Sequence, residues 1–467
     1  MQFPKQTFWT IVTIALMIVA LEYVPALQNY RLLNREVLDQ LSEFHPTRAF
    51  PPEPIPTVEM KLPTQKPVKK AVEPLSDPAN SLAAFYEAIE RVERGEPGAK
   101  VRIAHYGDSP TTADLITADV RSLLQKRFGD GGHGFYLLAK PWAWYGHRGV
   151  DSDSSGWDIE ASNLVHDKDG FYGYGGVSFR GGPGSRTRFR PKDAGTTSVE
   201  VAYRAIPGGG NLVLDACGES MGDKPTAGEN EDGFALFTVP ETCRDFTLRI
   251  ESGPVRLYGI QFLNPASGVV YDSLGLNGAY ISVLSKFLNE DHWTLQLQHY
   301  SPDVVVINYG TNESVNAAYV DKVFERELRE AIRRIRTALP GKGILVMSPM
   351  DRGERNTAGV IETVPALEHL VEIESRVAKE EGVAFFNTFE AMGGNGTMAK
   401  WYSAEPRLVG ADFIHPMPGG AKIIGNLLYK AMLDGYNHVK QCKNGNASGS
   451  ARVLMGECPA QSVPLPH

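Results

Sequence analysis

One stretch, Val101-Arg-Ile-Ala-His-Tyr-Gly-Asp-Ser-Pro-Thr-Thr-Ala-Asp114, passes from a strand pattern through a polar turn into a helix pattern. Its first six residues are apolar or β-prone, which predicts a short buried strand over Val101–Tyr106. Apolar residues at helical spacing then predict a helix from Thr112 to Phe128. A serine at such a turn lies at the carboxyl edge of a sheet, where open α/β folds bind ligands. The backbone N–H of Ser109, at a helix N-terminus, can stabilise a developing oxyanion.

The Gly-Asp-Ser turn on its own has two interpretations. These residue types are also common in ordinary turns and helix caps, where they carry no chemistry. The choice depends on which residues the rest of the chain brings to the same sheet edge.

From Val269 onward the chain alternates between strand and helix patterns. With the opening strand, this alternation gives about five short buried strands and predicts a parallel sheet covered by helices on both faces. The expected strands are Val269–Leu274, Asp303–Tyr309, Gly343–Ser348 and Val383–Asn387, and the expected helices are Gly278–Leu288, Ala317–Ala338, Ala366–Glu381 and Pro418–Leu433.

The residues between these two α/β parts have a different pattern. Residues 135–265 are dense in glycine and aromatic residues, and their short alternating runs end at Gly, Pro or Asp turns. This pattern predicts an inserted β-sandwich or jelly roll. Six aromatic residues in it either form a sugar-stacking face or fill the core: Trp142, Trp144, Tyr145, Trp157, Tyr172 and Tyr174.

The N-terminus contains an uncharged apolar run, Phe8–Leu21, which follows Lys5 and continues to Leu27. Its core has the length of a signal-peptide core, and the whole run just reaches membrane-spanning length. We expect an uncleaved signal-anchor at residues 8–27, tethering the protein to the inner membrane, with a cleaved signal peptide as the alternative. Both place the rest of the chain in the periplasm or cell envelope, and the proline-rich residues that follow predict a spacer.

The four cysteines form two local pairs, Cys217 with Cys243 and Cys442 with Cys458, which predict two disulfides in an oxidising compartment. No Cys-x-x-Cys occurs, and neither pair is combined with histidine at ligand spacing, so no metal site is expected. The net charge of −8 comes without a basic block, which argues against nucleic acid as a partner.

Three further segments place polar residues where a strand or loop leads into a helix. Asp412-Phe-Ile-His415 precedes the last expected helix, and its spacing lets a carboxylate orient an imidazole that deprotonates a serine. Asn312 and Gly278 each follow an expected strand and so lie at the same sheet edge as Ser109. An amide side chain and a glycine N–H at that edge can bind an oxyanion. Each residue alone also fits a turn, a cap or a structural histidine, and their joint placement favours a site.

The order Gly107-Asp-Ser109, Gly278, Gly310-x-Asn312 and Asp412-x-x-His415 resembles the four blocks of the SGNH (GDSL-like) hydrolase superfamily. The resemblance implies that Ser109 is the nucleophile, that His415 is the general base and that Asp412 orients His415. It also implies an oxyanion hole formed by the N–H groups of Ser109 and Gly278 and the side chain of Asn312. Pro110 replaces the leucine of the name-giving tetrapeptide, at a position that varies in the superfamily.

A narrower resemblance is to peptidoglycan O-acetylesterases. It rests on the segments Gly107–Asp114, Arg127-Phe-Gly-Asp-Gly-Gly-His-Gly134 and Leu274-Gly-Leu-Asn-Gly-Ala279. In that group a β-sandwich that resembles a carbohydrate-binding module lies between the serine block and the glycine block, as the insertion does here. The resemblance implies an acetylated glycan as substrate.

The expected fold is therefore a flavodoxin-like SGNH hydrolase three-layer sandwich interrupted by an all-β domain. The expected parts are a signal-anchor or signal peptide (1–27), a spacer (28–78), the first part of the hydrolase domain (79–134), the insertion (135–265), the second part of the hydrolase domain (266–436) and a C-terminal tail (437–467).

The expected function is a serine esterase that removes O-acetyl groups from a cell-envelope polysaccharide, with peptidoglycan as the expected substrate and without a metal or organic cofactor. Two alternatives stay open. One is an O-acetyltransferase with the same catalytic residues, and the other is a catalytically idle glycan-binding protein that works through the insertion. The sequence does not indicate the oligomeric state.

Overall fold

The computed structural model describes residues 74–164 and 169–443. The expected membrane segment (8–27), most of the expected spacer and Cys458 lie outside these ranges. Within them, no helix has both the length and the apolar character that crossing a membrane requires.

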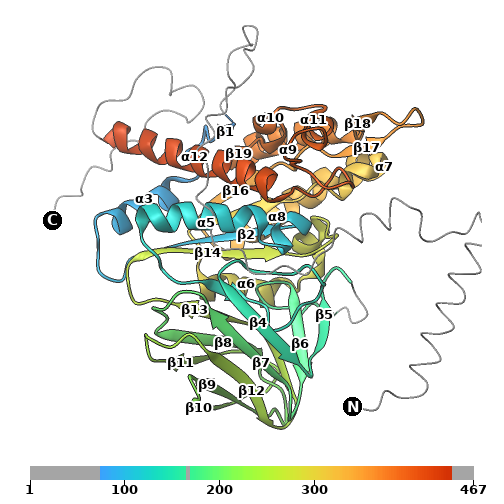
Figure 1. Cartoon of the computed structure of the whole chain (residues 1–467). Coiled ribbons are helices and arrows are strands. Elements are labelled where there is room, and N and C mark those ends of the chain that lie inside the picture. Colours follow the sequence, from blue (N-terminus) through green and yellow to red (C-terminus); the bar gives the residue numbers. More distant parts are fainter. Residues whose placement is uncertain (1–73, 165–168, 444–467) are drawn as a thin grey trace, which may run out of the picture. The chain divides into compact units, whose positions relative to one another are not determined.

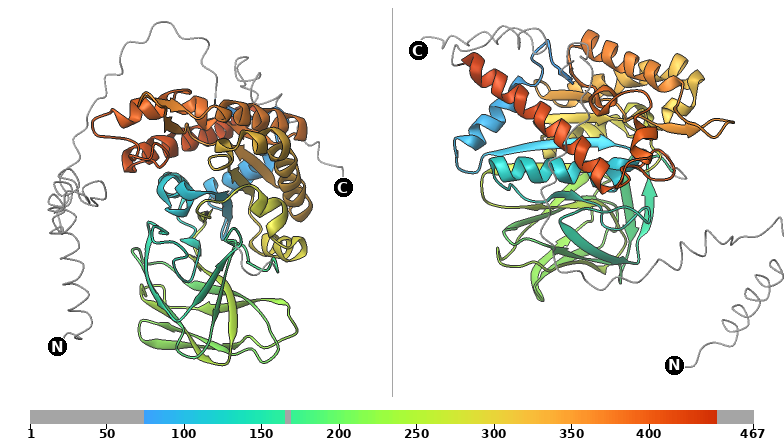
Figure 2. Two further views of the ribbon diagram at one scale, coloured as in Figure 1. Left: turned by 90° about the vertical axis from the view of Figure 1, so that its right-hand side faces the viewer. Right: turned by 45° about the horizontal axis from the view of Figure 1, so that its top comes forward.

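A six-stranded sheet forms the centre of the α/β part (Figures 1 and 2). Only β1 is antiparallel to its neighbour, and the other five strands pair in parallel, which confirms the predicted sheet. The strand order is β1 (Leu75–Ser76), β19 (Ala384–Phe386), β16 (Gly343–Met347), β15 (Val304–Asn308), β2 (Lys100–Gly107) and β14 (Gly268–Gly275).

Helices cover both faces of this sheet (Figure 1). The side chains of β2 alternate between two cores, because Val101 and Ile103 join one and Ala104 and Tyr106 join the other. One face carries α3 (Ala83–Glu93), α5 (Leu115–Phe128) and α12 (Pro418–Lys443), and the other carries α6 (Glu290–Tyr300), α8 (Glu325–Ala338) and α9 (Ala366–Glu381). The shorter elements are α10 (Thr388–Met392), α11 (Thr397–Tyr402), the 3₁₀ turn η3 (Glu313–Val315) and the hairpin of β17 (Gly353–Arg355) and β18 (Ile361–Thr363).

The folded part of the chain begins earlier than expected. β1 lies within residues 28–78, which we predicted to be a spacer, and it pairs with β19 at the edge of the sheet. The next turn is also ordered by side chains, because the buried Asp77 carboxylate accepts the backbone N–H groups of Ser81 (2.8 Å) and Leu82 (3.0 Å). The predicted boundary at residue 78 is therefore too late.

The helix predicted over Thr112–Phe128 is divided into α4 (Ser109–Thr112) and α5. Asp114 lies at the break with a φ of 51°, in the left-handed region. Its buried carboxylate accepts hydrogen bonds from the guanidinium of Arg121 at 2.6 and 3.0 Å and from the hydroxyl of Thr117 at 2.6 Å. These partners hold the Asp114 side chain inward, which apolar spacing does not reveal.

Three other predicted helices also differ. The segment Gly278–Leu288 is a loop that ends in the π-turn η2 (Val283–Phe287). The segment Ala317–Ala338 is made of α7 (Ala317–Tyr319), η4 (Val320–Phe324) and α8. The last helix continues past the predicted end at Leu433 to Lys443, because Tyr436 and Val439 are also buried.

The residues between the two α/β parts form two antiparallel sheets, which confirms the predicted all-β insertion (Figure 1). The predicted disulfide between Cys217 and Cys243 joins the end of β9 (Asn211–Ala216) to the loop before β12 (Phe246–Ser252), with a Cα–Cα distance of 5.8 Å. The Cys442–Cys458 prediction involves a residue outside the described ranges. One sheet consists of β10 (Glu219–Pro225), β9 (Asn211–Ala216), β12 (Phe246–Ser252), β7 (Arg186–Pro191) and β4 (Val150–Ser155); the other consists of β11 (Asp232–Thr238), β8 (Ser198–Arg204), β13 (Val255–Leu263), β6 (Val177–Gly181) and β5 (Asp158–Ala161), with β3 (Gly134–Tyr136) paired to β13.

A buried polar network joins the insertion to the central sheet. The carboxylate of Asp272, on β14, accepts hydrogen bonds from the guanidinium of Arg102 (2.9 Å), the hydroxyl of Tyr174 (3.1 Å) and the backbone N–H of Phe135 (2.9 Å). Arg102 also donates to the side chain of Gln261 on β13 at 2.8 Å. Residues from both domains therefore share one set of buried hydrogen bonds.

The six aromatic residues of the insertion do not form a common exposed face. Tyr145, Tyr172 and Tyr174 are buried in the core, and Trp142 and Trp157 are partly buried against it. Trp144 alone of the six is largely exposed, with 55% of its surface accessible. The alternative that these aromatics are core residues is therefore correct for most of them.

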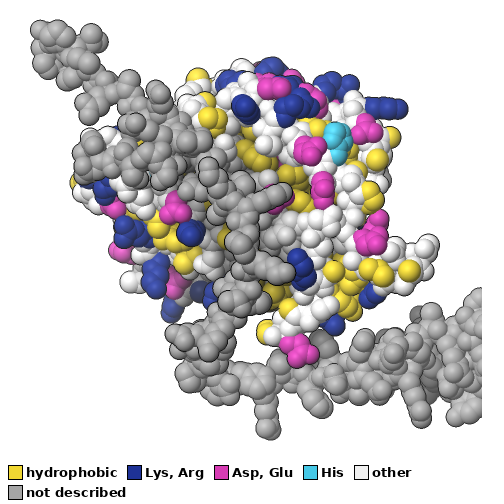
Figure 3. Space-filling model, turned by 90° about the horizontal axis from the view of Figure 1, so that it is seen from above, with side chains coloured by type: hydrophobic (Ala, Val, Ile, Leu, Met, Phe, Trp, Pro, Cys, Tyr) yellow, Lys and Arg dark blue, Asp and Glu magenta, His cyan; other side chains and the backbone are white. Residues whose placement is uncertain are grey.

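Charged side chains of both signs are interspersed on the face seen in Figure 3, without a block of one sign. On the insertion, charged side chains pair with one another, as Arg188 does with Asp245 and Arg249 with Asp215 (2.9 Å).

Candidate active site

Three of the predicted residues, Ser109, His415 and Asp412, form one chain of hydrogen bonds. Ser109 begins α4 directly after β2, and its Oγ lies 2.8 Å from Nε2 of His415. The other ring nitrogen of His415, Nδ1, lies 2.7 Å from Oδ2 of Asp412. Ser109 is buried, whereas the side chains of His415 and Asp412 are 44% and 47% exposed. The arrangement can remove a proton from the serine hydroxyl as that oxygen attacks a carbonyl carbon.

The loop before α12 explains how residues three positions apart converge. Phe413 has a φ of 59°, and its N–H donates to the carbonyl oxygen of Gly410 at 3.1 Å, which closes a tight turn. Oδ1 of Asp412 accepts the backbone N–H groups of Ile414 (3.0 Å) and His415 (3.1 Å). Burial acts to raise the pKa of Asp412, but the hydrogen bonds from His415 and from these N–H groups outweigh it and hold the pKa below its ordinary value.

The predicted oxyanion residues Gly278 and Asn312 come from neighbouring loops. Nδ2 of Asn312 donates to the carbonyl oxygen of Ala279 at 2.9 Å, so the loops after β14 and β15 touch. Gly278 has a φ of 70°, a left-handed conformation that favours glycine. The loop after β14 also lies against the serine turn, because the N–H of Leu276 donates to the carbonyl oxygen of Gly107 at 3.0 Å. All five predicted site residues are thus brought to one edge of the sheet.

Glu313 is a residue of this site that the sequence interpretation missed. Its carboxylate is fully buried and accepts the backbone N–H groups of Ile281 (2.7 Å) and Gly310 (3.0 Å). It therefore fastens the loop that contains Gly278 to the loop that contains Asn312. Burial raises the pKa of Glu313 to about 8, although the hydrogen bonds from these N–H groups oppose the shift. The feature of the sequence that could have identified Glu313 is its position directly after Asn312.

Asp108 and Arg352 add two further ionisable groups. Burial raises the pKa of Asp108 to about 6, against the lowering effects of a hydrogen bond from Thr311 and of the His415 and Arg352 charges. Arg352 lies beyond the carboxyl end of β16, the next strand along the sheet, and its Nη1 donates to the carbonyl oxygen of Thr311 at 2.6 Å. Asn312 was predicted to lie in the site because it follows the carboxyl end of a parallel strand. The same reasoning applies to Arg352, which follows β16.

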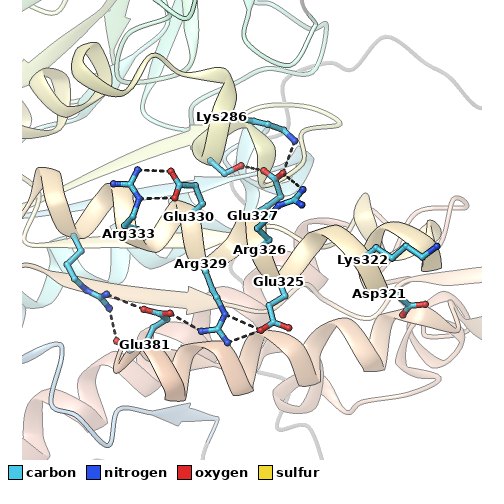
Figure 4. Close-up of a pocket in the computed structure, with 12 residues that line it drawn as sticks. Lys286, Asp321, Lys322, Glu325, Arg326, Glu327, Arg329, Glu330, Arg333 and Glu381 are labelled. Atoms are coloured by element: carbon cyan, nitrogen blue, oxygen red, sulfur yellow. Dashed lines mark hydrogen bonds and ion pairs between the residues drawn. The ribbon is translucent and has the colours of Figure 1, made fainter.

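A separate surface hollow lies along η4 and α8 (Figure 4). Its charged side chains pair with one another, as Arg329 does with Glu325 (2.8 Å) and Glu381 (2.8 Å). None of the five predicted site residues lines it. Across the described ranges, no group of three or more His, Cys, Asp or Glu side chains is arranged to hold a metal ion.

Comparison with known proteins identifies the fold. The GDSL-like Lipase/Acylhydrolase family matches residues 255–423. A solved structure of a peptidoglycan O-acetylesterase is 25% identical with a TM-score of 0.65, and the match covers 78% of this chain and 99% of that one. The chain has the SGNH hydrolase fold and is an esterase. The family match of this SGNH hydrolase includes Gly278, Asn312 and His415 but begins after Ser109.

Other solved structures match less of this SGNH hydrolase. A putative GDSL-like lipase from Parabacteroides merdae is 18% identical with a TM-score of 0.28, covering 35% of this chain and 72% of that one. A family two carbohydrate esterase from Clostridium thermocellum, in complex with cellohexaose, is 14% identical with a TM-score of 0.25, covering 60% and 99%. The sequence comparison with curated proteins found no match.

Proposed function

We propose that this SGNH hydrolase removes O-acetyl groups from a cell-envelope polysaccharide and that peptidoglycan is its substrate. The observation that carries the proposal is the hydrogen-bonded chain from Ser109 through His415 to Asp412, beside the loops of Gly278 and Asn312. The likeness to a peptidoglycan O-acetylesterase over 99% of that protein's chain, insertion included, supports the choice of substrate.

In the proposed reaction, Oγ of Ser109 attacks the acetyl carbonyl carbon while Nε2 of His415 takes the hydroxyl proton. The N–H groups of Ser109 and Gly278 and the amide of Asn312 stabilise the negative oxygen of the tetrahedral intermediate. His415 then donates its proton to the sugar oxygen, which leaves with its electron pair as the alcohol. Water, deprotonated by His415, attacks the acyl-enzyme and releases acetate and Ser109.

The proposed location is the extracytoplasmic face of the inner membrane, with residues 8–27 as the tether. The uncharged apolar run in the sequence supports this location, and so does the Cys217–Cys243 disulfide, because disulfides persist in oxidising compartments.

The test is acetate release from three substrates: O-acetylated peptidoglycan, acetylated xylan and a chromogenic acetate ester. Ser109→Ala should reduce release from all three to background, while Ser403→Ala, a change at an exposed serine outside the site, should not. Circular dichroism checks that both variants are folded. Retained turnover by folded Ser109→Ala would contradict the esterase site and favour the glycan-binding alternative. Acetyl transfer to an added glycan, in place of acetate release, would favour the acyltransferase alternative.

A second set of variants separates the roles of the other residues. Asn312→Ala should lower turnover by about 10²–10³, the usual effect of removing one oxyanion donor.

Asp412→Asn should lower turnover while preserving the fold, because it disturbs only the orientation and tautomer of His415. Ser109→Ala/His415→Ala should be hardly worse than either single change, because the two side chains act as a unit. If steady-state kinetics showed that the losses of turnover from the two single changes add in the double variant, the assignment of Ser109 and His415 as one unit would be contradicted.

A further inference from the structure

Arg352 is a cation of the candidate site that the proposed reaction does not use. It follows β16, and it is partly buried. Its Nη1 donates to the carbonyl oxygen of Thr311, the residue before Asn312. The carboxylates of Asp108, Glu354 and Asp412 and the hydroxyl of Tyr280 lie close enough to interact with its charge. Arg352 therefore lies beside both the serine turn and the histidine turn.

Arg352 differs from other arginines that the fold buries. Arg102, Arg121 and Arg256 each form an ion pair with a carboxylate, at N···O distances of 2.9, 2.6 and 2.5 Å. No carboxylate within the described ranges forms an ion pair with Arg352. Desolvating a guanidinium that has no carboxylate in an ion pair with it costs free energy, so such a group is retained where it has another use.

The chemistry of this group suits one kind of ligand. A guanidinium presents five N–H donors in a planar fork that matches a carboxylate in a bidentate arrangement. One donor of Arg352 is used by Thr311, which holds the side chain in place and leaves other donors for a ligand. A substrate bound with its acetyl group at Ser109 would place its neighbouring substituents near this cation.

We propose that Arg352 binds a carboxylate of the substrate, so that the enzyme favours acetyl esters whose glycan carries negative charge close to the ester. This inference rests on the proposed function and narrows its substrate class. Peptidoglycan carries carboxylates on its peptide groups, and on its muramyl groups where the peptide has been removed, whereas the backbone of acetylated xylan is neutral. Arg352 is then a specificity-determining residue and takes no part in bond cleavage.

The test compares two small substrates that differ only in charge: an O-acetylated muramyl sugar with a free carboxylate and the same sugar as its carboxamide. The wild type should have the higher kcat/KM on the carboxylate form. Arg352→Gln should reduce that preference by about 10- to 100-fold, mainly through KM, as expected for a hydrogen bond to a charged group. Arg352→Lys should keep part of the preference, and added salt should weaken it in the wild type.

Arg407→Gln is the matched control, because Arg407 is exposed on the segment before the histidine turn, where its guanidinium stacks over the ring of Tyr402. It should leave the preference unchanged. Equal losses on both sugars for Arg352→Gln would overturn the proposal and make Arg352 a positioning residue for the Thr311–Asn312 loop. An unchanged preference would also overturn it. Failure of the proposed function is distinguishable, because it would appear as no acetate release from O-acetylated peptidoglycan by the wild type.

Discussion

Burial determines the protonation state of Glu313, a single residue of this site. Its carboxyl group joins the two loops that carry Gly278 and Asn312, and burial raises its pKa from 4.5 to about 8. Glu374 is a second buried carboxyl, whose pKa is raised by burial and by the charge of Glu313. At neutral pH the native state therefore holds a proton on Glu313 that the unfolded chain has released.

This proton makes stability depend on pH in a defined direction. Between the unfolded pKa and the folded pKa, the native state binds more protons than the unfolded state, so the free energy of unfolding falls as pH rises from 4.5 to about 8. The contribution is at most about 1.4 kcal/mol per pH unit. Glu313→Gln has no titrating group, so its stability relative to the wild type should increase over this range and then level off. Urea unfolding of both proteins at several pH values measures this difference in the free energy of unfolding. A difference that does not change with pH would contradict the prediction.

At the scale of elements, the loop between β3 and β4 belongs to the insertion but contacts the active-site loops. The N–H of Gly146 donates to the carbonyl oxygen of Thr112 in α4 at 3.4 Å. Nε1 of Trp144 donates to Oδ1 of Asn277, the residue before Gly278, at 3.1 Å. This hydrogen bond holds the edge of an indole ring that is otherwise largely exposed. A ring held in this way offers an apolar face on which a sugar can stack.

Trp144→Ala should therefore weaken turnover of O-acetylated polymer by about 2- to 10-fold, the usual range for one aromatic contact, and affect a small acetate ester less. Trp144→Phe should keep part of the effect, because a stacking face remains. Leu236→Ala is the control, since Leu236 is similarly exposed (54%) on β11. Kinetics on both substrates measure the difference, and equal losses on both would mean that Trp144 shapes the Gly278 loop instead.

At the scale of the whole molecule, the inserted sheets and the α/β part are connected by the hydrogen bonds of Asp272. This carboxylate is fully buried on β14, and its partners come from β2, β3 and the segment before β6. Removing the carboxylate leaves a buried guanidinium, a hydroxyl and a backbone N–H without their acceptor. The two domains should therefore unfold together, and the stability of both should depend on Asp272.

Asp272→Ala should lower the free energy of unfolding by about 3–5 kcal/mol, because it leaves the charge of Arg102 buried and unpaired. Asp153→Ala is the matched control, since it breaks the exposed ion pair with Arg190 on the insertion and should cost less than about 1 kcal/mol. Chemical denaturation followed by circular dichroism measures both. A wild-type profile with two separate transitions, and no effect of Asp272→Ala on one of them, would contradict the shared network.

The sequence alone was enough to predict the parallel sheet, the inserted sheets, the placement of Ser109 and Asn312 at one sheet edge, and the pairing of Asp412 with His415. Local rules are sufficient for these features. Apolar periodicity identifies buried strands, parallel strands end at one edge, and a tight turn brings together residues three positions apart. The first and third rules use only neighbours in the chain, and the second requires only that the strands share one parallel sheet, so none needs knowledge of side-chain packing.

The contacts of Glu313, Arg352 and Trp144 could not be predicted from the sequence. Their partners lie on other segments, such as Ile281 for Glu313 and Thr311 for Arg352, and a polar or aromatic side chain carries no sequence mark of a distant partner. The break in the helix at Asp114 has the same cause, because a buried guanidinium holds its carboxylate inward. Burial and long-range hydrogen bonds assign these roles, and both arise when the chain has folded.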